Sequence, residues 1–437
     1  MIQTKNQQKN PRIVQITSLD RKGRGKGTTN TGGVLAVPYT IPGEEVLAEK
    51  HPRKLGTVVD ILQPAAQRTQ PRCRHFTHCG GCALQHISYD HQLRLKREKV
   101  AELFQRHDIP WAINDLPITG SPDYAYRNRM DFVWWYDGRF GLRRAGKWNA
   151  MENLEECHLL PQEVMELVLE LKRRALSLGL PFRDQKKRVR GLRYFIIRRG
   201  VFTSDVMVNI VSDSMDIPPE LWADSSAITS VYQLINNNLE RDTSDGEPVH
   251  LAGYPYYREK ILGHEFQIGP TCFFQPNPVV TQEMVRYVRT LLTSSGTRTG
   301  LLDLYCGVGV FSILLADLFP KAIGIESHFE SIVSARENDG KSAVQFIHSE
   351  AERTDTSLWK GLDTLVVDPP RTGLHPDVIQ AMLGHPFRDV VYVCCNPVRG
   401  VEDLAVLQAK YTIKSVHLFD QFPQTPHVEM IAHLVQH

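Results

Sequence analysis

Five apolar runs in the last third of the chain constrain its fold more than any other feature. Each run is short, a helix-length segment separates it from the next, and the runs read LLDLY, KAIGIE, VQFIHS, TLVVDPP and VVYVCC. Short strands that are apolar on both faces and alternate with helices are typical of a parallel sheet covered on both sides. Two further runs, at 413–419 and 428–434, extend the pattern. We therefore predict a doubly wound, Rossmann-like α/β domain over residues 263–437.

The rest of the chain predicts two β-rich domains. In residues 1–66, apolar runs at 13–16, 34–37, 46–48 and 58–62 are separated by glycine and proline, which favours a small β-barrel of the oligonucleotide-binding type. Residues 67–262 contain an Asp137-Gly138 hairpin signal and alternating apolar positions from Val206 to Ile210. We expect this second region to be a mainly antiparallel α+β domain.

The charge balance leaves the binding of a polyanion to local patches. The chain has 437 residues, 23% of them charged, and a formal net charge of +2. Two segments are rich in cations. The predicted barrel loops carry Arg21, Lys22, Arg24 and Lys26. Residues 183–199 carry Lys186, Lys187, Arg188, Arg190, Arg193 and Arg198. Either set could contact a nucleic acid backbone. The alternative for the second set is a solvated surface strand and turn.

The N-terminal segment predicts the location of the protein. MIQTKNQQKNPR is polar, with neither the apolar core of a signal peptide nor an arginine-rich presequence, and the chain has no run of 18 apolar residues. We expect a cytoplasmic monomer with no membrane segment and with reduced thiols.

Four cysteines are spaced as metal ligands. Cys73, Cys79 and Cys82 lie in CRHFTHCGGC, and Cys157 follows in EECH. A zinc site usually pairs two short Cys-x-x-Cys motifs, and only one is present here, so the pattern favours a 4Fe-4S cluster. Zinc binding and unligated structural thiols remain the alternatives.

A glycine-containing loop and an acidic residue indicate a nucleoside site. DLYCGVG, residues 303–309, ends the first run of the predicted parallel sheet, and Glu326 ends the second, where an acidic residue typically binds a ribose diol. Ser312 stands where the dinucleotide motif expects a third small residue, which favours a ligand without phosphates. S-adenosylmethionine is such a ligand. The alternative is a strand–helix turn that binds nothing.

Cys395 is the candidate nucleophile. It is the last residue of an apolar run and precedes an Asn396-Pro397 turn, so its thiol is expected at the ligand-binding edge of the sheet, whereas Cys394 is expected inside. A thiolate that adds to C6 of a pyrimidine makes C5 nucleophilic, as methylation of that carbon requires. The sequence therefore predicts covalent catalysis by Cys395.

Two carboxylates accompany this thiol. Asp368 begins a DPP turn that also occurs in enzymes that methylate amino groups, but Arg371 stands where those enzymes place an aromatic residue. Arg371 would also increase the thiolate fraction of the nucleophile. Glu429 is the candidate base for the C5 proton, and His427 is its competitor.

Seven motifs, in this order, resemble the RNA 5-methyluridine methyltransferases. They are RCRHFTHCGGC, YDHQLRLKREKV, CFFQPNP, DLYCGVGVFS, VVDPPRTGL, VYVCCNP and FPQTPHVE, and they span nearly the whole chain. The first 66 residues likewise resemble a TRAM domain, which is an RNA-binding barrel. Two positions depart from the family pattern: Val310 replaces a polar residue of some members, and Cys394 replaces a common serine.

The resemblance implies roles for individual residues. Cys395 would be the nucleophile and Glu429 the proton acceptor. The residues around S-adenosylmethionine would be Gln275, Tyr305, Val310, Glu326, Glu350 and Asp368, and the ligands of the 4Fe-4S cluster would be Cys73, Cys79, Cys82 and Cys157. Uracil is implied as the target, because cytosine-directed relatives usually carry a further cysteine where this chain has Pro369 and Pro370.

We expect an enzyme that methylates C5 of a flipped-out uridine in structured RNA. The RNA would be 23S ribosomal RNA, with the T-loop of transfer RNA as the alternative. Methyl transfer consumes no electrons, so the cluster would be architectural. Other functions compatible with the sequence are an amino-group methyltransferase, an RNA-binding or assembly factor without catalysis, and a redox protein built on the cysteines.

Overall fold

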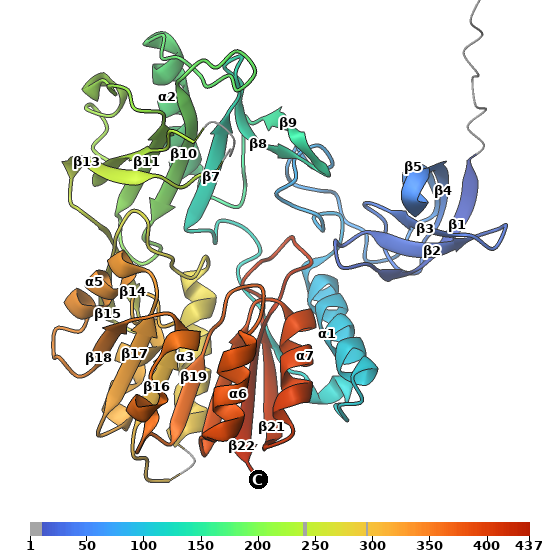
Figure 1. Ribbon diagram of the computed structural model, residues 1–437. Helices are drawn as coiled ribbons and strands as arrows, with labels where there is room; N and C mark the ends of the chain where they lie inside the picture. The colour runs from blue at the N-terminus through green and yellow to red at the C-terminus, as the bar shows by residue number, and fades with distance from the viewer. Residues whose placement is uncertain (1–10, 239–242, 294–295) are drawn as a thin grey trace, which may run out of the picture. The chain divides into compact units, whose positions relative to one another are not determined.

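The computed structural model describes residues 11–238, 243–293 and 296–437. The chain divides into two compact units, and most of its strands and helices are labelled in Figure 1. The first unit comprises Met1–Lys96, Arg143–Glu152 and Phe422–Pro426, and the second comprises Arg97–Leu142, Asn153–Gln421 and His427–His437. The predicted domain boundaries at residues 66 and 262 stay predictions. The polar segment 1–10 lies outside the described residues.

The first unit contains the predicted small barrel. Its strands close in the order β1-β2-β3-β5-β4, with bounds β1 Arg12–Leu19, β2 Gly25–Thr29, β3 Val34–Val37, β4 Glu45–His51 and β5 Leu55–Gln63. The barrel core consists of Val14, Ile16, Leu35, Val37, Val46 and Ala48. The sequence pattern does not predict β2, because GKGTT has no apolar side chain. Gly27 lets β2 approach β1, since a Cβ there would lie 2.1 Å from the carbonyl oxygen of Gln15.

Two of the cations expected in the barrel loops are placed differently. Lys26 lies within β2. The guanidinium of Arg24 binds the carboxylate of Asp20, with Nε 2.7 Å from Oδ2. Lys26 is still exposed, so the predicted basic surface of the barrel loses only the charge of Arg24.

A buried carboxylate fastens the barrel to the chain that follows it. Glu44 is fully buried and accepts hydrogen bonds from the backbone N–H of Ile41 at 2.9 Å and from the guanidinium of Arg68 at 2.6 and 2.7 Å. Burial alone would raise the pKa of Glu44, but the hydrogen bonds and charge of Arg68 and two backbone N–H groups lower this pKa overall. Helix α1, Tyr89–Arg106, continues the chain from the first unit into the second.

The second unit contains the expected mainly antiparallel sheet. Its strand order is β13-β12-β11-β10-β7-β8, and the bounds are β7 Arg129–Trp134, β8 Phe140–Arg144, β10 Leu192–Arg199, β11 Val206–Ser212, β12 Ser230–Ile235 and β13 Glu247–Gly253. Strand β9, Lys147–Asn153, belongs to the first unit except for its last residue. Strands β11 and β12 are parallel, whereas β10 is antiparallel to both β11 and β7. Helix α2, Gln162–Ser177, buries its apolar side, including Val168 and Leu171.

The same unit contains the predicted doubly wound sheet. Its order is β18-β17-β16-β19-β20-β22-β21-β6, with bounds β6 Ile118–Thr119, β16 Leu301–Leu304, β17 Ala322–Glu326, β18 Gln345–His348, β19 Thr364–Val367, β20 Asp389–Cys394, β21 Tyr411–Phe419 and β22 Glu429–Gln436. Strands β18 to β20 are parallel, and β22 is antiparallel to both of its neighbours. All seven predicted runs are strands, and β6 is an addition that the sequence does not predict.

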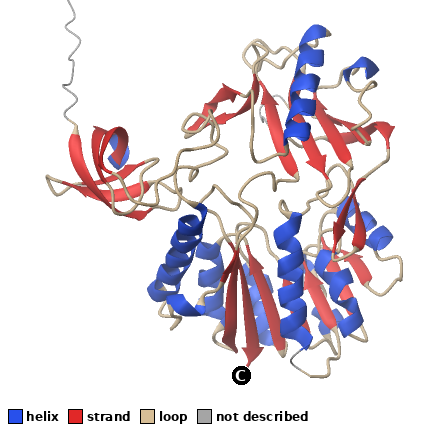
Figure 2. Cartoon of the chain, turned by 180° about the vertical axis from the view of Figure 1, so that it is seen from behind, coloured by secondary structure: helices blue, strands red, loops and turns tan. Residues whose placement is uncertain are grey.

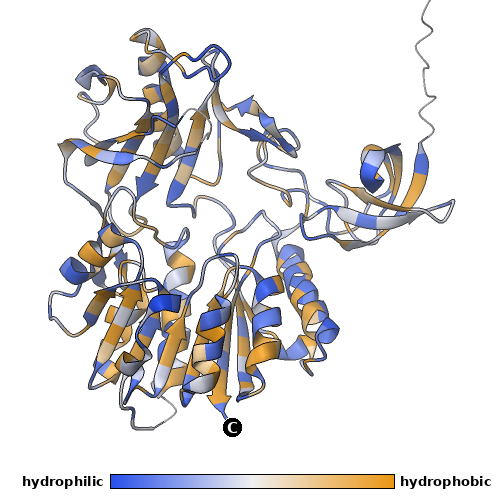
Figure 3. Ribbon diagram, viewed as in Figure 1, coloured by the Kyte–Doolittle hydropathy of each residue, from blue (hydrophilic) through white to orange (hydrophobic). Residues whose placement is uncertain are grey.

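Helices alternate with these strands, as Figure 2 shows by colour. They are α3 Pro278–Thr293, α4 Val310–Leu315, α5 Phe329–Asn338, α6 Pro376–Gly384 and α7 Pro397–Leu407, and a separate hairpin of β14 Tyr257–Ile261 and β15 His264–Ile268 precedes them. The strands are mostly hydrophobic, whereas α6 and α7 carry both hydrophobic and hydrophilic residues (Figure 3). This difference is the pattern of a sheet buried between amphipathic helices.

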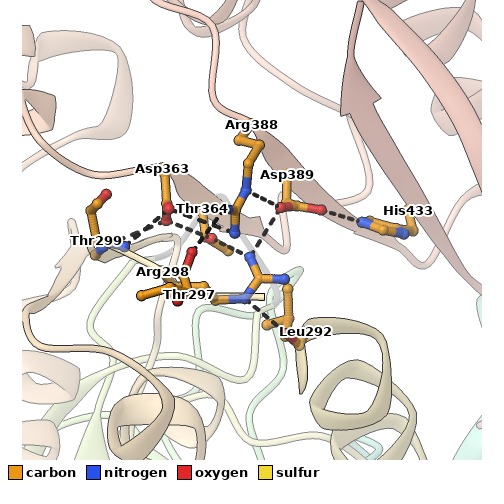
Figure 4. Close-up of polar contacts among 10 residues, drawn as sticks. Leu292, Thr297, Arg298, Thr299, Asp363, Thr364, Arg388, Asp389 and His433 are labelled. Atoms are coloured by element: carbon orange, nitrogen blue, oxygen red, sulfur yellow. Dashed lines mark hydrogen bonds and ion pairs between the residues drawn. The ribbon is translucent and has the colours of Figure 1, made fainter. Parts of the chain in front are cut away.

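A polar network holds the amino ends of the parallel strands (Figure 4). The carboxylate of Asp389, at the start of β20, accepts hydrogen bonds from Arg298 at 3.0 Å and Arg388 at 2.9 Å, and it lies 2.8 Å from Nε2 of His433. Arg298 also donates to Thr364 at the start of β19 at 2.7 Å. The network therefore joins β19, β20 and β22 at the edge opposite the strands' carboxyl ends. A membrane-spanning helix is not found in the described ranges, where every helix is too short or too polar.

Candidate active site

The carboxyl ends of four parallel strands bring the predicted site residues to one edge of the sheet. Tyr305 follows β16, Glu326 ends β17, Asp368 follows β19 and Cys395 follows β20. The register supports this placement, because Leu304 pairs with both Ile325 and Val367, and Val367 pairs with Tyr392. Ligands of open α/β sheets bind at this edge.

The loop after β16 forms a backbone cradle next to Glu326. Gly307 donates its N–H to Oε2 of Glu326 at 3.1 Å, and His328 donates its N–H to Oε1 at 2.7 Å, so the carboxylate is fixed at the strand end. A Cβ on Gly307 would meet nothing within 4 Å, which leaves open space beside the loop. Gly309 has φ 88° and is the N-cap residue of α4, whose first residue, Val310, is buried. This arrangement fits a nucleoside whose ribose hydroxyls bind the carboxylate.

Asp303 and Asp368 are two carboxyl groups with raised pKa values near this loop. Burial, followed by the charge of Asp368, raises the pKa of Asp303 to about 7, although the Ser312 hydroxyl donates a hydrogen bond to it. Its other oxygen, Oδ1, is buried without a hydrogen-bond donor among the described residues. Burial also raises the pKa of Asp368 to about 7, against the effect of Gln275, whose Nε2 donates to Oδ2 at 2.9 Å. Asp303 has no predicted role, because its burial could not be read from the motif.

The pairing of β20 with β22 places Cys395 next to Glu429. These strands are antiparallel, and their register ends with Cys394 opposite Met430. Cys395 follows directly after β20 and Glu429 directly precedes Met430, and the charge of Glu429 acts on the Cys395 thiol. Cys394 is 3% exposed and Glu429 is 2% exposed, whereas Cys395 is partly exposed. The thiol that the sequence proposed as the nucleophile is therefore the accessible one of the pair.

Two turns meet at this thiol. Asn396 is the N-cap residue of α7, and its Nδ2 donates to the carbonyl oxygen of Arg371 at 3.0 Å. Arg399, one turn along α7, donates to the carbonyl oxygen of Thr372 at 3.1 Å. These bonds tie the turn that follows Asp368 to the turn that follows Cys395.

The electrostatic environment raises the pKa values of both catalytic candidates. Burial, then the charges of Glu429 and Asp368, raise the pKa of Cys395 to about 12, and the charge and hydrogen bond of Arg371 lower it by less. Burial, then the charge of Asp368, raise the pKa of Glu429 well above its ordinary value. The expectation that Arg371 increases the thiolate fraction has the right sign, but burial and two carboxylates outweigh this effect.

Comparison with known proteins decides the family. Residues 260–437 match the family tRNA (Uracil-5-)-methyltransferase. The tRNA (uracil(54)-C(5))-methyltransferase of Pyrococcus abyssi is 33% identical over 92% of this chain and 96% of its own length. An uncharacterized RNA methyltransferase of Caldanaerobacter subterraneus is 30% identical over 96% of this chain and 97% of its own. The chain belongs to the RNA uracil-C5 methyltransferase family.

A solved structure of this methyltransferase family has the same fold. The crystal structure of Pyrococcus abyssi tRNA (uracil-54, C5)-methyltransferase in complex with S-adenosyl-L-homocysteine superposes with a TM-score of 0.81 at 30% identity, over 97% of this chain and 99% of that one. The predicted enzyme class and the Rossmann-like fold with a five-stranded barrel are thereby confirmed.

Polar side chains of the central sheet support the segment that carries Gln275. Arg198 is fully buried and donates to the carbonyl oxygens of residues 269, 270 and 272 at 2.7, 2.8 and 2.6 Å. Asn209 donates to the carbonyl oxygen of residue 270 at 2.9 Å, and Asn128 to that of Gln275 at 2.8 Å. The sequence placed Arg198 in a basic surface patch. That placement is wrong, because its charge is satisfied inside the methyltransferase by carbonyl groups.

Three further residues that the sequence assigns to the methyltransferase site differ in their exposure and contacts. Glu350 is exposed, and its carboxylate pairs with Arg353 at 2.6 Å. His427, the alternative base, is half-buried. Tyr305 has φ 63°, and burial raises the pKa of its hydroxyl to about 12.

The structure does not support the predicted metal centre. Cys73, Cys79 and Cys82 are half-buried in a loop held by backbone bonds, including Gly80 N–H to the carbonyl oxygen of Arg143 at 2.8 Å. Within the described ranges, no three His, Cys, Asp or Glu side chains are arranged to hold a metal ion. Cys157 belongs to the second unit, and burial raises the pKa of its thiol. The 4Fe-4S cluster therefore rests on the spacing of the cysteines and on the family resemblance.

Proposed function

We propose that this enzyme transfers a methyl group from S-adenosylmethionine to C5 of a uridine in structured RNA, through a covalent bond between Cys395 and C6. The observation that carries the proposal is the placement of an accessible thiol opposite a buried carboxyl group at the ligand-binding edge of the sheet. A cysteine has no role in amino-group methylation, whereas methylation of a pyrimidine carbon requires a nucleophile.

The proposed reaction has three steps, which are attack by sulfur, methyl transfer and loss of the C5 proton. The Cys395 thiol first loses its proton to water. The thiolate sulfur then bonds to C6 as the C5–C6 π electrons shift toward C5, and C5 bonds to the methyl carbon. S-adenosylmethionine supplies an electrophilic methyl group and leaves as the neutral thioether. Glu429, as the carboxylate, accepts the C5 proton. The C5–H electron pair re-forms the C5–C6 double bond, and the sulfur departs as the thiolate.

The cofactor would lie along the strand edge. Glu326 would bind the ribose diol, and Gln275 and Asp368 would position the donor, supported by the bond between them. Tyr305 and Val310 would contribute ring and backbone contacts next to the cradle. Glu350 is retained only from the family resemblance, because its carboxylate faces Arg353. The relative crystallised with S-adenosyl-L-homocysteine supports this choice of cofactor.

Transfer RNA is the RNA that the relatives favour. The sequence put 23S ribosomal RNA first, but the Pyrococcus relatives are named for uracil 54 of transfer RNA. We therefore propose the T-loop uridine of transfer RNA as the target, and the barrel, as a TRAM-like module, would contribute RNA contacts. Mapping of 5-methyluridine in transfer and ribosomal RNA from a deletion strain distinguishes the two.

Tritium release tests the reaction itself. RNA carrying tritium at C5 of uridine should release it to water as fast as labelled methyl groups are incorporated. Cys395→Ala should abolish both, and Cys394→Ala is the matched control that should retain both. Methylation that persists in Cys395→Ala would favour an amino-group enzyme, and a protein that binds RNA without consuming the donor would favour an assembly factor.

The iron–sulfur cluster is a separate proposal with its own test. Protein purified without oxygen should contain about four iron atoms per chain if Cys73, Cys79, Cys82 and Cys157 hold a 4Fe-4S cluster. Iron-free protein of unchanged stability and activity would overturn it.

A further inference from the structure

The basic segment 183–199 divides into two kinds of cation. The guanidinium of Arg193 is buried and pairs with Asp213 at 2.9 Å, and Arg183 donates to the carbonyl oxygen of Asn238 at 2.9 Å. Arg198 is the buried donor described above. By contrast, all the cations of residues 186–190 are exposed, and they are Lys186, Lys187, Arg188 and Arg190. We call residues 184–190, which carry these four, the basic hairpin.

The basic hairpin has a defined backbone. Asp184 and Val189 exchange two backbone hydrogen bonds, at 3.1 and 3.0 Å. Between them, the carboxylate of Asp184 accepts the N–H groups of Lys186 at 2.9 Å and Lys187 at 3.2 Å. At its base, a Cβ on Gly191 would lie 2.2 Å from the carbonyl oxygen of residue 181, so only glycine lets the two arms approach. Backbone bonds therefore fix how the four cations are presented.

One residue of the hairpin adopts a costly conformation. Arg188 has φ 56°, in the left-handed region, which costs a side-chain-bearing residue about 1 kcal/mol. Glycine would remove this cost. The position instead carries a cation, and strain of this kind at an exposed loop tip is associated with function.

The charge of the hairpin is not balanced within the described part of the chain. No ion pair there joins any of the four cations to a carboxylate, and the Asp184 carboxylate is engaged by backbone N–H groups. Four positive charges within five residues contrast with a formal net charge of +2 for all 437 residues. An unbalanced cluster of this kind on a hydrogen-bonded hairpin matches a polyanion whose charges repeat along a backbone.

We propose that the basic hairpin is a docking site for the phosphate backbone of the RNA substrate, outside the catalytic site. The inference rests on the proposed function, because RNA is the polyanion that the enzyme would bind. The hairpin contributes to the affinity for folded RNA and takes no part in the chemistry.

The salt dependence of RNA binding tests the inference. In the variant Lys186→Gln, Lys187→Gln, Arg188→Gln and Arg190→Gln, the slope of log Kd against log salt for a transfer RNA transcript should fall by about 2 to 4, as loss of that many phosphate contacts requires. The KM for RNA should rise at least about tenfold at physiological salt, with kcat at saturating RNA unchanged.

Two control variants isolate the hairpin. The first loses the same charge from exposed lysines elsewhere, as K341Q, K360Q, K410Q and K414Q, and should keep the wild-type slope. The second keeps the charge of the hairpin, as K186R, K187R, R188K and R190K, and should also keep the wild-type slope. Circular dichroism and thermal unfolding show whether each variant is folded.

An equal slope and KM for the hairpin variant and the first control would overturn the inference. So would a fall in kcat with unchanged KM, or hairpin-dependent binding to phosphatidylserine vesicles without hairpin-dependent binding to RNA. Failure of the proposed function is distinct, since it is the absence of methyl transfer by the wild-type protein.

Discussion

The reactivity of Cys395 in the enzyme without substrates should depend on pH in an unusual way. Its pKa is raised to about 12 by burial and by the charges of Glu429 and Asp368. At pH 8 the thiolate fraction is then about 1 in 10,000, compared with about 1 in 4 for an ordinary thiol of pKa about 8.5. A thiolate of higher pKa is also the stronger nucleophile, so alkylation should be about fifty- to a hundredfold slower than that of an ordinary cysteine.

The shape of the pH profile separates ionisation from access. We would measure the rate of iodoacetamide labelling from pH 7 to 10.5 by mass spectrometry, in a Cys394→Ala background that leaves one thiol in the peptide. The logarithm of the rate should rise by about one per pH unit with no plateau. Limited access alone would lower every rate equally and leave a plateau near the ordinary pKa, and such a plateau would refute the reasoning.

Two substitutions should shift this profile in opposite directions. Arg371→Gln removes the group that lowers the pKa of Cys395, so labelling at fixed pH should slow. Glu429→Gln removes a carboxyl group whose charge raises it, so labelling should accelerate. Shifts of the same sign would contradict the electrostatic explanation.

Three further predictions concern the supporting structure. Arg198→Met should destabilise the second unit by about 3 kcal/mol in urea unfolding and raise the KM for the methyl donor. Recovery of that KM in Arg198→Lys would show that Arg198 supports the segment of Gln275, as opposed to a general loss of folded structure. Hydrogen bonds from His433 and Arg388 and the charge of Arg298 overcome burial and lower the pKa of Asp389 to about 2. The ionised Asp389 should therefore stabilise the folded state by about 2 kcal/mol above its unfolded pKa of about 3.9, and this stabilisation should be lost as the pH falls toward 2. Asp389→Asn should flatten this loss in acid unfolding. Glu44→Gln should lower the melting temperature of the barrel at neutral pH but have little effect in acid, because the lowered pKa of Glu44 stabilises only above the range in which it is protonated.

The fold was predictable wherever hydrophobic burial alone determines the pattern. The strands of the doubly wound sheet are apolar on both faces, so short runs of valine, isoleucine and leucine predicted them. Strand β2 was missed because backbone pairing and Gly27, not apolar side chains, define it. The Asp137-Gly138 turn is longer than the expected two-residue turn, since Trp135 N–H bonds the carbonyl oxygen of Arg139 and only Gly138 has positive φ.

The site was predictable to the extent that it lies at strand ends. Cys395, Asp368 and Glu326 each follow or end a parallel strand, so topology alone brings them to one edge. The raised pKa of Asp303 and the carbonyl contacts of Arg198 depend on tertiary burial, which no local pattern encodes. For the same reason, the sequence could not separate structural arginines from exposed ones in residues 183–199.

A denaturing gel tests the central claim most directly. The claim is that the sulfur of Cys395 bonds to the uracil ring and that Glu429 then removes the C5 proton. With labelled transfer RNA and S-adenosylmethionine, Glu429→Gln should accumulate a protein–RNA band that survives denaturation, and adding Cys395→Ala to that variant should abolish the band. A band that persists without Cys395 but disappears with Cys394→Ala, or full methylation by a variant lacking both thiols, would contradict the account.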